Sequence, residues 1–144
     1  MDKINQKKTV LKNALNKLYQ SINNLKEFNI HSKTQSLNYL DNNSLKESLR
    51  DSVIQRFEFS VDLFWKYIKL LLEYQLKEPT ELNSPRAIIE SACKSKLISE
   101  KDAEEIIEMI KCRNKTSHIY QEEIAEQIAR DIPNYYEIIK KYSK

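Results

Sequence analysis

The chain has 144 residues, of which 40% are hydrophobic, so it can bury the core of one domain without disulfide bonds or a structural metal. It has no glycine and only three prolines, which excludes the glycine-rich phosphate loops of Rossmann and P-loop proteins and disfavours sheets and barrels. The formal net charge of +3 does not by itself indicate nucleic-acid binding.

The first predicted element is a helix over residues 3–28, where apolar residues recur at the three-, four- and seven-residue spacing of one helical face. A polar connection follows over residues 29–43 and ends in a turn cluster at residues 41–43. Ser44 and Glu47 have the spacing of a capping box, so the second helix is predicted to begin at Ser44.

The second predicted helix carries the longest run of periodic apolar residues and ends before Pro79. Its aromatic residues Phe57, Phe64 and Trp65 are expected to pack in the core rather than to contact a ligand. This helix is therefore predicted to be the hydrophobic centre of the fold.

Two shorter helices are predicted next. Ser84 followed by proline is a helix start, because the serine caps the first amides and proline needs no amide donor, which predicts a helix over residues 85–96. Ser99 and Asp102 form another capping-box pair and predict a helix that runs toward Arg113.

The last predicted helix spans residues 122–142 and contains Pro133, which we expect to kink the helix without ending it. Together the elements predict an all-α fold, an antiparallel four-helix bundle with one short additional helix. No linker or internal repeat divides the chain, so a single domain over residues 1–144 is expected.

Other features bear on location and on metals. No stretch approaches the ~20 consecutive apolar residues of a membrane-spanning helix, and we expect a cytoplasmic protein that contacts no membrane. Cys93 and Cys112 lie far apart without a CxxC pair, so two free thiols, no metal site and no cofactor are expected. Arg113 lies next to Cys112, and a thiol of lowered pKa is the less favoured alternative.

Lysines gather near the two ends of the sequence. A solvated helix face is the favoured interpretation of these lysines, and an RNA-binding track is the alternative. They are Lys3, Lys7, Lys8, Lys12, Lys140, Lys141 and Lys144.

The most informative segment is residues 113–120, with the sequence RNKTSHIY. Arg113 offers a permanent charge with a planar fork of donors suited to phosphate, and His118 offers an imidazole for proton transfer. Such a pair suits RNA cleavage without a metal, in which histidine takes the proton of the ribose 2′-hydroxyl and arginine stabilises charge on the phosphate. The products then carry a 2′,3′-cyclic phosphate.

Geometry sets a condition on this pair. Residues five apart lie about 140° apart on an uninterrupted helix, so Arg113 and His118 cannot face one ligand unless the helix breaks. Asn114, Thr116 and Ser117 favour such a break, because their side chains bond locally to the backbone. Alternatively, a second subunit of a two-fold dimer supplies the missing group. A plainer interpretation also stays open, in which the spacing arises by chance and the histidine only caps a helix end.

Four blocks in order resemble the HEPN superfamily. They are residues 56–59 (RFEF), 63–66 (LFWK), 84–86 (SPR) and 113–120 (RNKTSHIY). The sequence is most similar to nucleotidyltransferase substrate-binding proteins and to HepT-type toxins, which are encoded beside a minimal nucleotidyltransferase (MNT). The resemblance covers most of the chain from about Ser44 onward, and several ordered blocks are more specific than the short motif alone.

The resemblance implies a helical bundle that dimerises so that two motifs face each other, and in many members a metal-independent ribonuclease. Arg113 then contacts the scissile phosphate, His118 acts as acid or base, and Asn114 orients the pocket. In HepT-like members the partner nucleotidyltransferase transfers adenylate to the tyrosine two residues after the histidine, which is Tyr120 here. A phosphate added there would engage the arginine and exclude substrate.

Two further residues are candidates for pocket support. Ser117 belongs to the motif itself. Glu58 is predicted to pair with Arg56, Lys66 or Arg113 at the dimer groove, with a solvated ion pair as the more favoured role.

Two functions from different classes fit this sequence. The first is a ribonuclease toxin that acts as a homodimer on RNA and is silenced by its cognate MNT. The second is a noncatalytic subunit that presents substrate to a separate nucleotidyltransferase. The intact run of arginine, histidine and tyrosine favours the first.

Overall fold

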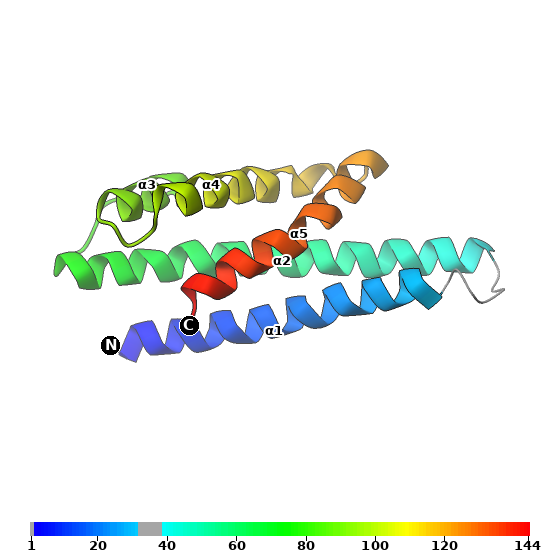
Figure 1. Cartoon of the computed structure of the whole chain (residues 1–144), viewed down its shortest axis with the longest axis horizontal. Coiled ribbons are helices and arrows are strands. Elements are labelled where there is room, and N and C mark those ends of the chain that lie inside the picture. The colour runs from blue at the N-terminus through cyan, green and yellow to red at the C-terminus, as the bar shows by residue number, and fades with distance from the viewer. Residues whose placement is uncertain (1, 32–38) are drawn as a thin grey trace.

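The computed structural model describes residues 2–31 and 39–144, and every regular element in these ranges is helical (Figure 1). Four long helices and one short helix account for the architecture, so the predicted all-α bundle is confirmed. The elements are α1 (Asp2–His31), α2 (Tyr39–Leu76), α3 (Pro85–Lys94), α4 (Glu100–Asn114), the 3-10 helix η1 (Lys115–His118) and α5 (Glu122–Tyr142).

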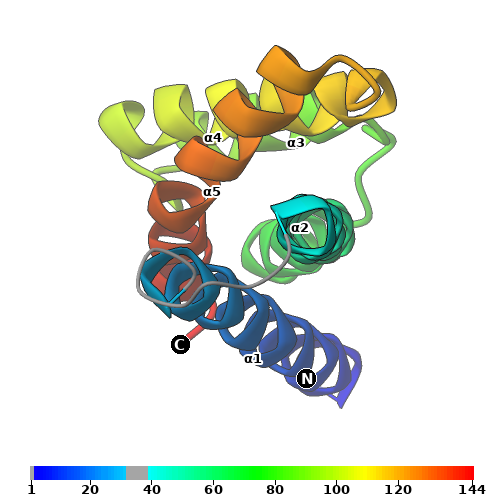
Figure 2. The ribbon, with the colours of Figure 1, turned by 90° about the vertical axis from the view of Figure 1, so that its right-hand side faces the viewer.

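The two longest helices, α1 and α2, lie side by side and antiparallel (Figure 1). In the end view of Figure 2, α3 and α4 lie on the other side of α2 from α1, and α5 runs from the α4 side to the α1 side. α5 contacts α1, α2 and α4, so it closes the bundle over the buried face of α2.

The predicted starts of the two middle helices are confirmed. Ser84 caps α3, with its hydroxyl oxygen accepting from the Ala87 amide at 3.4 Å. Ser99 caps α4 in the same way, accepting from the Asp102 amide at 3.2 Å. Each cap satisfies an amide that has no partner inside its helix.

The start of the second helix was predicted wrongly. α2 begins at Tyr39 instead of Ser44, and α1 continues to His31. Ser44 is an exposed residue inside α2, five residues after the helix begins. The helical pairing of α1 with α2 overrides this local signal. Part of the predicted connection, residues 32–38, lies outside the described residues.

Two helices end without the glycine that usually takes the left-handed position. Lys77 after α2 has φ 58° and Lys96 after α3 has φ 63°. At the end of α3 the Leu97 amide donates to the Ala92 carbonyl at 2.9 Å and the Lys96 amide donates to the Cys93 carbonyl at 3.0 Å. This pair of bonds is the Schellman motif, which forms here although the chain contains no glycine.

Pro133 lies inside α5, and the helix continues through it, as predicted. Proline removes one backbone hydrogen bond, which costs about 3 kcal/mol or more in a helix interior. Buried residues on both sides of the proline, including Ile132 and Tyr136, hold the helix in place against the bundle.

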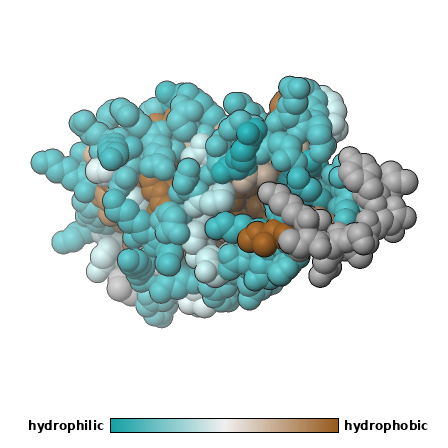
Figure 3. All heavy atoms as spheres, turned by 45° about the vertical axis from the view of Figure 1, so that its right-hand side comes forward, coloured by the Kyte–Doolittle hydropathy of each residue, from teal (hydrophilic) through white to brown (hydrophobic). Residues whose placement is uncertain are grey.

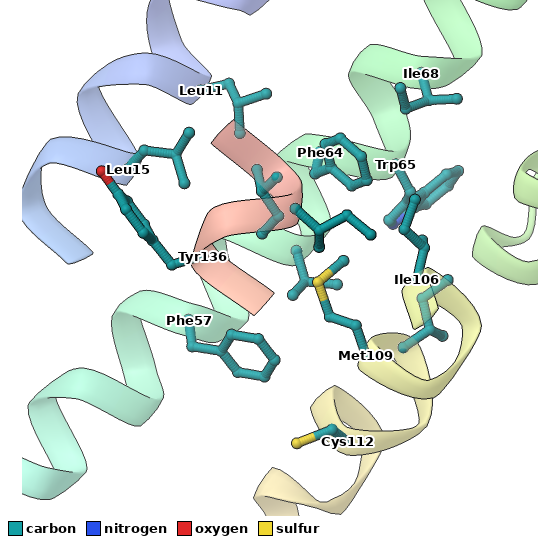
Figure 4. Packing of buried hydrophobic residues seen from close by; sticks show 14 of the residues in the cluster. Leu11, Leu15, Phe57, Phe64, Trp65, Ile68, Ile106, Met109, Cys112 and Tyr136 are labelled. Atoms are coloured by element: carbon teal, nitrogen blue, oxygen red, sulfur yellow. The ribbon is translucent and has the colours of Figure 1, made fainter. Parts of the chain in front are cut away.

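The core is formed by residues from every helix. Phe57 and Phe64 of α2 are fully buried and Trp65 is 9% exposed, so the prediction that they pack in the core is confirmed. Figure 4 shows these rings beside Met109 of α4 and Tyr136 of α5. This packing holds the C-terminal part of α4, and therefore Arg113, against α2.

The outer surface is mainly hydrophilic on the face drawn in Figure 3, where apolar atoms form only small patches. Within residues 2–31 and 39–144, no helix is both long enough and apolar enough to cross a membrane.

Candidate functional site

Arg113 is the anchor of the candidate site. It lies in the last turn of α4, where its guanidinium makes a two-pronged contact with Asp62 of α2. Nε donates to one carboxylate oxygen and Nη2 to the other, both at 3.1 Å. Nη1 donates to the Thr116 hydroxyl at 3.3 Å, and that hydroxyl donates to the Arg113 carbonyl at 2.8 Å. The arginine is thus held in one orientation by groups 51 and 3 residues away.

The electrostatics keep this arginine charged. The hydrogen bonds that Arg113 donates to Asp62 raise the pKa of Arg113, with partial burial opposing them and the nearby charge of Glu58 adding to them. The three contacts use three of the five N–H groups of a guanidinium. The other two are left to contact a ligand, since no other hydrogen bond of Arg113 occurs within the described residues.

The α-helix ends one residue after Arg113, within the segment where the sequence favoured a break. α4 ends at Asn114 and the tighter η1 follows. The His118 carbonyl then accepts from the Gln121 amide at 2.9 Å, which closes the turn before α5. The change of helix type alters the direction of residues 115–118 relative to a continued α-helix.

His118 and Tyr120 lie on the surface after this break. His118 is exposed, and its ring packs edge-on to the Tyr120 ring with 6.1 Å between centroids. Tyr120 is 77% exposed, and its phenol oxygen accepts from the Gln121 side-chain amide at 3.4 Å. Within one described chain, Arg113 bonds to Asp62 and Thr116, and no hydrogen bond joins it to His118.

Glu58, Asn114 and Ser117 were predicted to support the pocket around Arg113. Glu58 lies one helical turn before Asp62 on α2, partly buried, so two carboxylates face Arg113. Asn114 and Ser117 are exposed in the segment between Arg113 and His118. None of the three forms a hydrogen bond with Arg113 in the described part of the chain.

Asp62 is the residue of the candidate site that sequence reasoning missed. A signal was available, because Glu58 and Asp62 are four residues apart and therefore lie on one helical face beside each other. The signal was incomplete, since nothing local indicates that this face meets the end of α4.

A second arginine, which is buried, positions the segment after the motif. Arg50 of α2 is 4% exposed, and its guanidinium binds Glu122 and Glu126 in the first turns of α5, the latter at 3.1 Å, as well as Asp51. Burial lowers the pKa of Arg50, but the hydrogen bonds to Glu122, Glu126 and Asp51 outweigh it, so the net pKa is raised. This cluster ties the start of α5 to α2 and so fixes where the chain goes after Tyr120.

Cys112 does not have the lowered pKa that its neighbour Arg113 suggested. Its thiol is buried, and burial raises the pKa to about 11, with the charge of Asp131 adding to it and Lys115 opposing it. Arg113 directs its guanidinium to Asp62 instead. The thiol is therefore protonated at neutral pH and acts as a small core residue, as the favoured prediction had it.

The arrangement provides two groups for phosphate chemistry. Arg113 is an oriented cation with two N–H groups left for a ligand. His118 is an accessible imidazole five residues later. Across the described residues, no cluster of three or more His, Cys, Asp or Glu side chains is arranged to hold a metal.

Solved structures share this fold. A protein from Thermus thermophilus is 25% identical, with a TM-score of 0.61 over 87% of this chain and 94% of that one. A Haemophilus influenzae protein, described as a substrate-binding domain of a nucleotidyltransferase, is 21% identical, with a TM-score of 0.75 over 95% of this chain and 99% of that one. A toxin–antitoxin structure with AMP-PNP is 17% identical, with a TM-score of 0.69 over 99% of this chain and 96% of that one.

The last two likenesses establish the fold alone, because their identities are below 25%. No curated protein matches the sequence at a significant level. Residues 6–144 match the family described as nucleotidyltransferase substrate binding protein like. Since that match spans nearly the whole chain, this protein belongs to the nucleotidyltransferase substrate-binding protein family.

Proposed function

We propose that this protein is a HEPN-type, metal-independent endoribonuclease that works as a homodimer and is silenced by a partner minimal nucleotidyltransferase. The observation that carries the proposal is the guanidinium of Arg113, held in one orientation by Asp62, with the exposed imidazole of His118 five residues later in the same segment. The family match supports a nucleotidyltransferase partner. The likeness in fold to a chain of a toxin–antitoxin structure is compatible with this role.

The proposed reaction uses only side chains of this protein and no metal ion. The imidazole of His118 takes the proton of a ribose 2′-hydroxyl, and the 2′-oxygen attacks the adjacent phosphorus. The bond from phosphorus to the 5′-oxygen breaks, and that oxygen leaves with a proton from a histidine, so the products are a 2′,3′-cyclic phosphate and a 5′-hydroxyl. Arg113 stabilises the negative charge that develops on the phosphate.

A homodimer completes the site in this proposal. In one chain the guanidinium of Arg113 is directed to Asp62, and no hydrogen bond joins it to His118. A two-fold axis beside η1 would bring two arginines and two exposed histidines around one phosphate. The second histidine then serves as the acid while the first serves as the base. Asn114, Ser117 and Glu58 support the pocket around these groups.

Silencing in this proposal acts through Tyr120. Tyr120 is 77% exposed, so a nucleotidyltransferase can reach it. The phenol oxygen attacks the α-phosphorus of a nucleoside triphosphate and pyrophosphate leaves, so the tyrosine carries a nucleotide. The new phosphate lies beside His118 and competes with RNA for Arg113.

The test is RNA cleavage by protein made without its partner, in EDTA, with tRNA and total RNA as substrates. Wild type is expected to cleave and to leave cyclic phosphate ends, whereas Arg113→Ala and His118→Ala are expected to lose at least about 100-fold in rate. Arg130→Ala, which removes an exposed arginine on α5, is the matched control and should cleave like wild type. All four proteins are first compared by circular dichroism and light scattering, to confirm that they are folded and dimeric.

The second candidate function is a noncatalytic subunit that presents substrate to a nucleotidyltransferase. The family description favours it, as does the description of the H. influenzae protein. It needs no proton transfer, so it predicts that unmodified wild type leaves RNA intact while still binding a nucleotidyltransferase. Absence of cleavage by folded, unmodified wild-type dimer would replace the ribonuclease with this function.

A further inference from the structure

A groove runs along the surface where α1 lies beside α2. It consists of two hollows that share Val10 of α1. The first is bounded by Lys3 and Lys7 on α1 and by Lys66 and Lys69 on α2. The second is bounded by Lys17 on α1 and Arg56 on α2, and Phe59 and Leu63 also line it. We call these two hollows together, with their six cations, the α1–α2 groove.

The groove is built by helical periodicity on both sides. Its residues on α1 and on α2 recur mainly at intervals of three and four, so each helix contributes one stripe. Because the helices are antiparallel, Lys17 lies toward Arg56 and Lys3 lies toward Lys69. At the ~1.5 Å rise of an α-helix, the stretch from Lys3 to Lys17 is about 21 Å long.

The groove concentrates positive charge. Against its six cations stands one carboxylate among the described lining residues, that of Glu73. The local excess is larger than the formal net charge of +3 of the entire chain. The groove therefore has a local excess of positive charge while the rest of the chain is close to neutral, which is the charge pattern of a surface that attracts a polyanion.

An exposed aromatic ring lies in the same groove and close to the candidate site. Phe59 is 55% exposed, so its ring is accessible to a ligand. It lies between Arg56 and Asp62, three residues from each on α2, so all three are neighbours on the helix surface. Asp62 holds Arg113, so the groove passes within one helical turn of the residue that orients the Arg113 guanidinium.

We propose that the α1–α2 groove binds a single-stranded segment of RNA next to the nucleotide that is cleaved. This inference rests on the proposed function, because it takes RNA to be the substrate. The lysines contact successive phosphates, and Phe59 provides a flat surface on which a base stacks, which is the combination that binds single strands without sequence preference. A second copy of this groove is disfavoured as the occupant, since two sets of six cations repel each other.

The test measures binding separately from cleavage. The probe is a fluorescein-labelled 2′-O-methyl oligouridylate of about 12 nucleotides, a length within the site sizes of single-strand-binding domains. It has no 2′-hydroxyl to attack the phosphate, so wild-type protein binds it without cleaving it. Fluorescence anisotropy in EDTA over a range of salt concentrations gives the affinity and its salt dependence.

The informative variant is Lys7→Gln with Lys66→Gln, one lysine from each side of the groove. Each phosphate contact with a single strand adds about 0.7 to the slope of log affinity against log salt, so the slope should fall by about 1.4 and the affinity by about 25-fold at about 0.1 M salt. Phe59→Ala should weaken binding by about tenfold with an unchanged slope, because stacking releases no counterions.

The matched control is Lys94→Gln with Lys101→Gln, which removes the same charge from exposed positions on α3 and α4 outside the groove. The control should bind like wild type. If the groove and control variants lose equal affinity, or if the groove variant loses none, the inference is overturned. A change in oligomeric state by Phe59→Ala without a change in RNA affinity also overturns it, since the ring would then belong to an interface between copies.

Failure of the proposed function has a different signature. If wild type does not cleave RNA but the groove variants still lose affinity selectively, the ribonuclease proposal fails and the groove assignment stands. If wild type cleaves RNA and the groove variants bind and cleave normally, the ribonuclease stands and the groove assignment fails.

Discussion

Asp62 determines how the Arg113 side chain is presented. Its two oxygens bind Nε and Nη2 of Arg113, so the N–H groups that do not contact Asp62 point away from its carboxylate. Asp62 has a half-exposed side chain, and water screens its charge, so the pair orients the arginine more than it stabilises the fold. At the residue scale, the candidate site is therefore an oriented cation whose partner lies on another helix.

Cys112 provides a prediction at the same scale. Burial raises the pKa of its thiol to about 11, so the folded protein holds it in the unreactive protonated form at pH 8, whereas Cys93 is only half-buried. Titration of thiols with Ellman's reagent at pH 8 should modify Cys93 readily and Cys112 only after urea is added. In Cys93→Ser, fast modification without urea would contradict this assignment.

The sign of the pH effect follows from the same shift. An unfolded thiol loses its proton near pKa 9.0, and the folded thiol retains it up to about 11. The folded protein therefore binds the thiol proton more tightly than the unfolded chain does. The resulting contribution to the free energy of unfolding is lost as the pH rises from 9 to 11.

At the scale of elements, the helices end without glycine at positions where glycine is usual. Lys96 occupies the left-handed position of the Schellman motif after α3, and Lys77 takes a similar conformation after α2. A residue with a β-carbon costs about 1 kcal/mol more than glycine in this left-handed backbone conformation. The loops that lead into α3 and α4 are therefore held by packing and capping despite local backbone strain.

Lys96→Gly is expected to raise the free energy of unfolding by about 0.5–1 kcal/mol, because glycine adopts positive φ without steric cost. The gain is partly reduced by the greater freedom of glycine in the unfolded chain. The control is Lys94→Gly in the last turn of α3, which should lower stability by about 1 kcal/mol. Urea denaturation compares the two variants with wild type, and an equal loss in both would show that Lys96 is not strained.

At the scale of the whole molecule, the start of α4 is tied to the end of α5. Asp102 is buried and its carboxylate accepts from Lys141 at 2.7 Å and from the Tyr142 hydroxyl. These two hydrogen bonds lower the pKa of Asp102, with burial acting against them. Together with the Arg50 cluster at the other end, the contact holds α5 across the bundle at both of its ends.

Asp102→Asn is therefore expected to destabilise the protein by about 1 kcal/mol at neutral pH, since Lys141 and Tyr142 then donate to a neutral acceptor instead of a charged one. The contribution of a carboxylate with a lowered pKa is complete above its unfolded pKa of 3.8 and is lost as the pH falls through the lower folded value. The difference from wild type should accordingly disappear in acid. Glu104→Gln, an exposed carboxylate on the same helix, is the control, and urea denaturation at neutral and acid pH is the measurement.

Much of this protein was determined by the sequence alone. Apolar spacing predicted the helices and the core rings, and serine caps predicted the starts of α3 and α4, because each depends on residues within a few positions of one another. The run at residues 113–120 was also found locally, and the break after Arg113 followed from its polar residues. The roles of Arg113, His118 and Tyr120 in catalysis and silencing stay predictions.

Only the tertiary structure decided which distant residues meet. The pairing of Arg113 with Asp62 joins residues 51 positions apart, and no local pattern specifies which face of α2 meets the end of α4. The α1–α2 groove also depends on tertiary packing. The sequence favoured a solvated helix face for Lys3 and Lys7, but these lysines lie opposite cations of α2 once the two helices pack. The spacing of apolar residues determines which face of a helix is buried. The packing of whole helices determines which residues of other helices that face and its flanking residues contact.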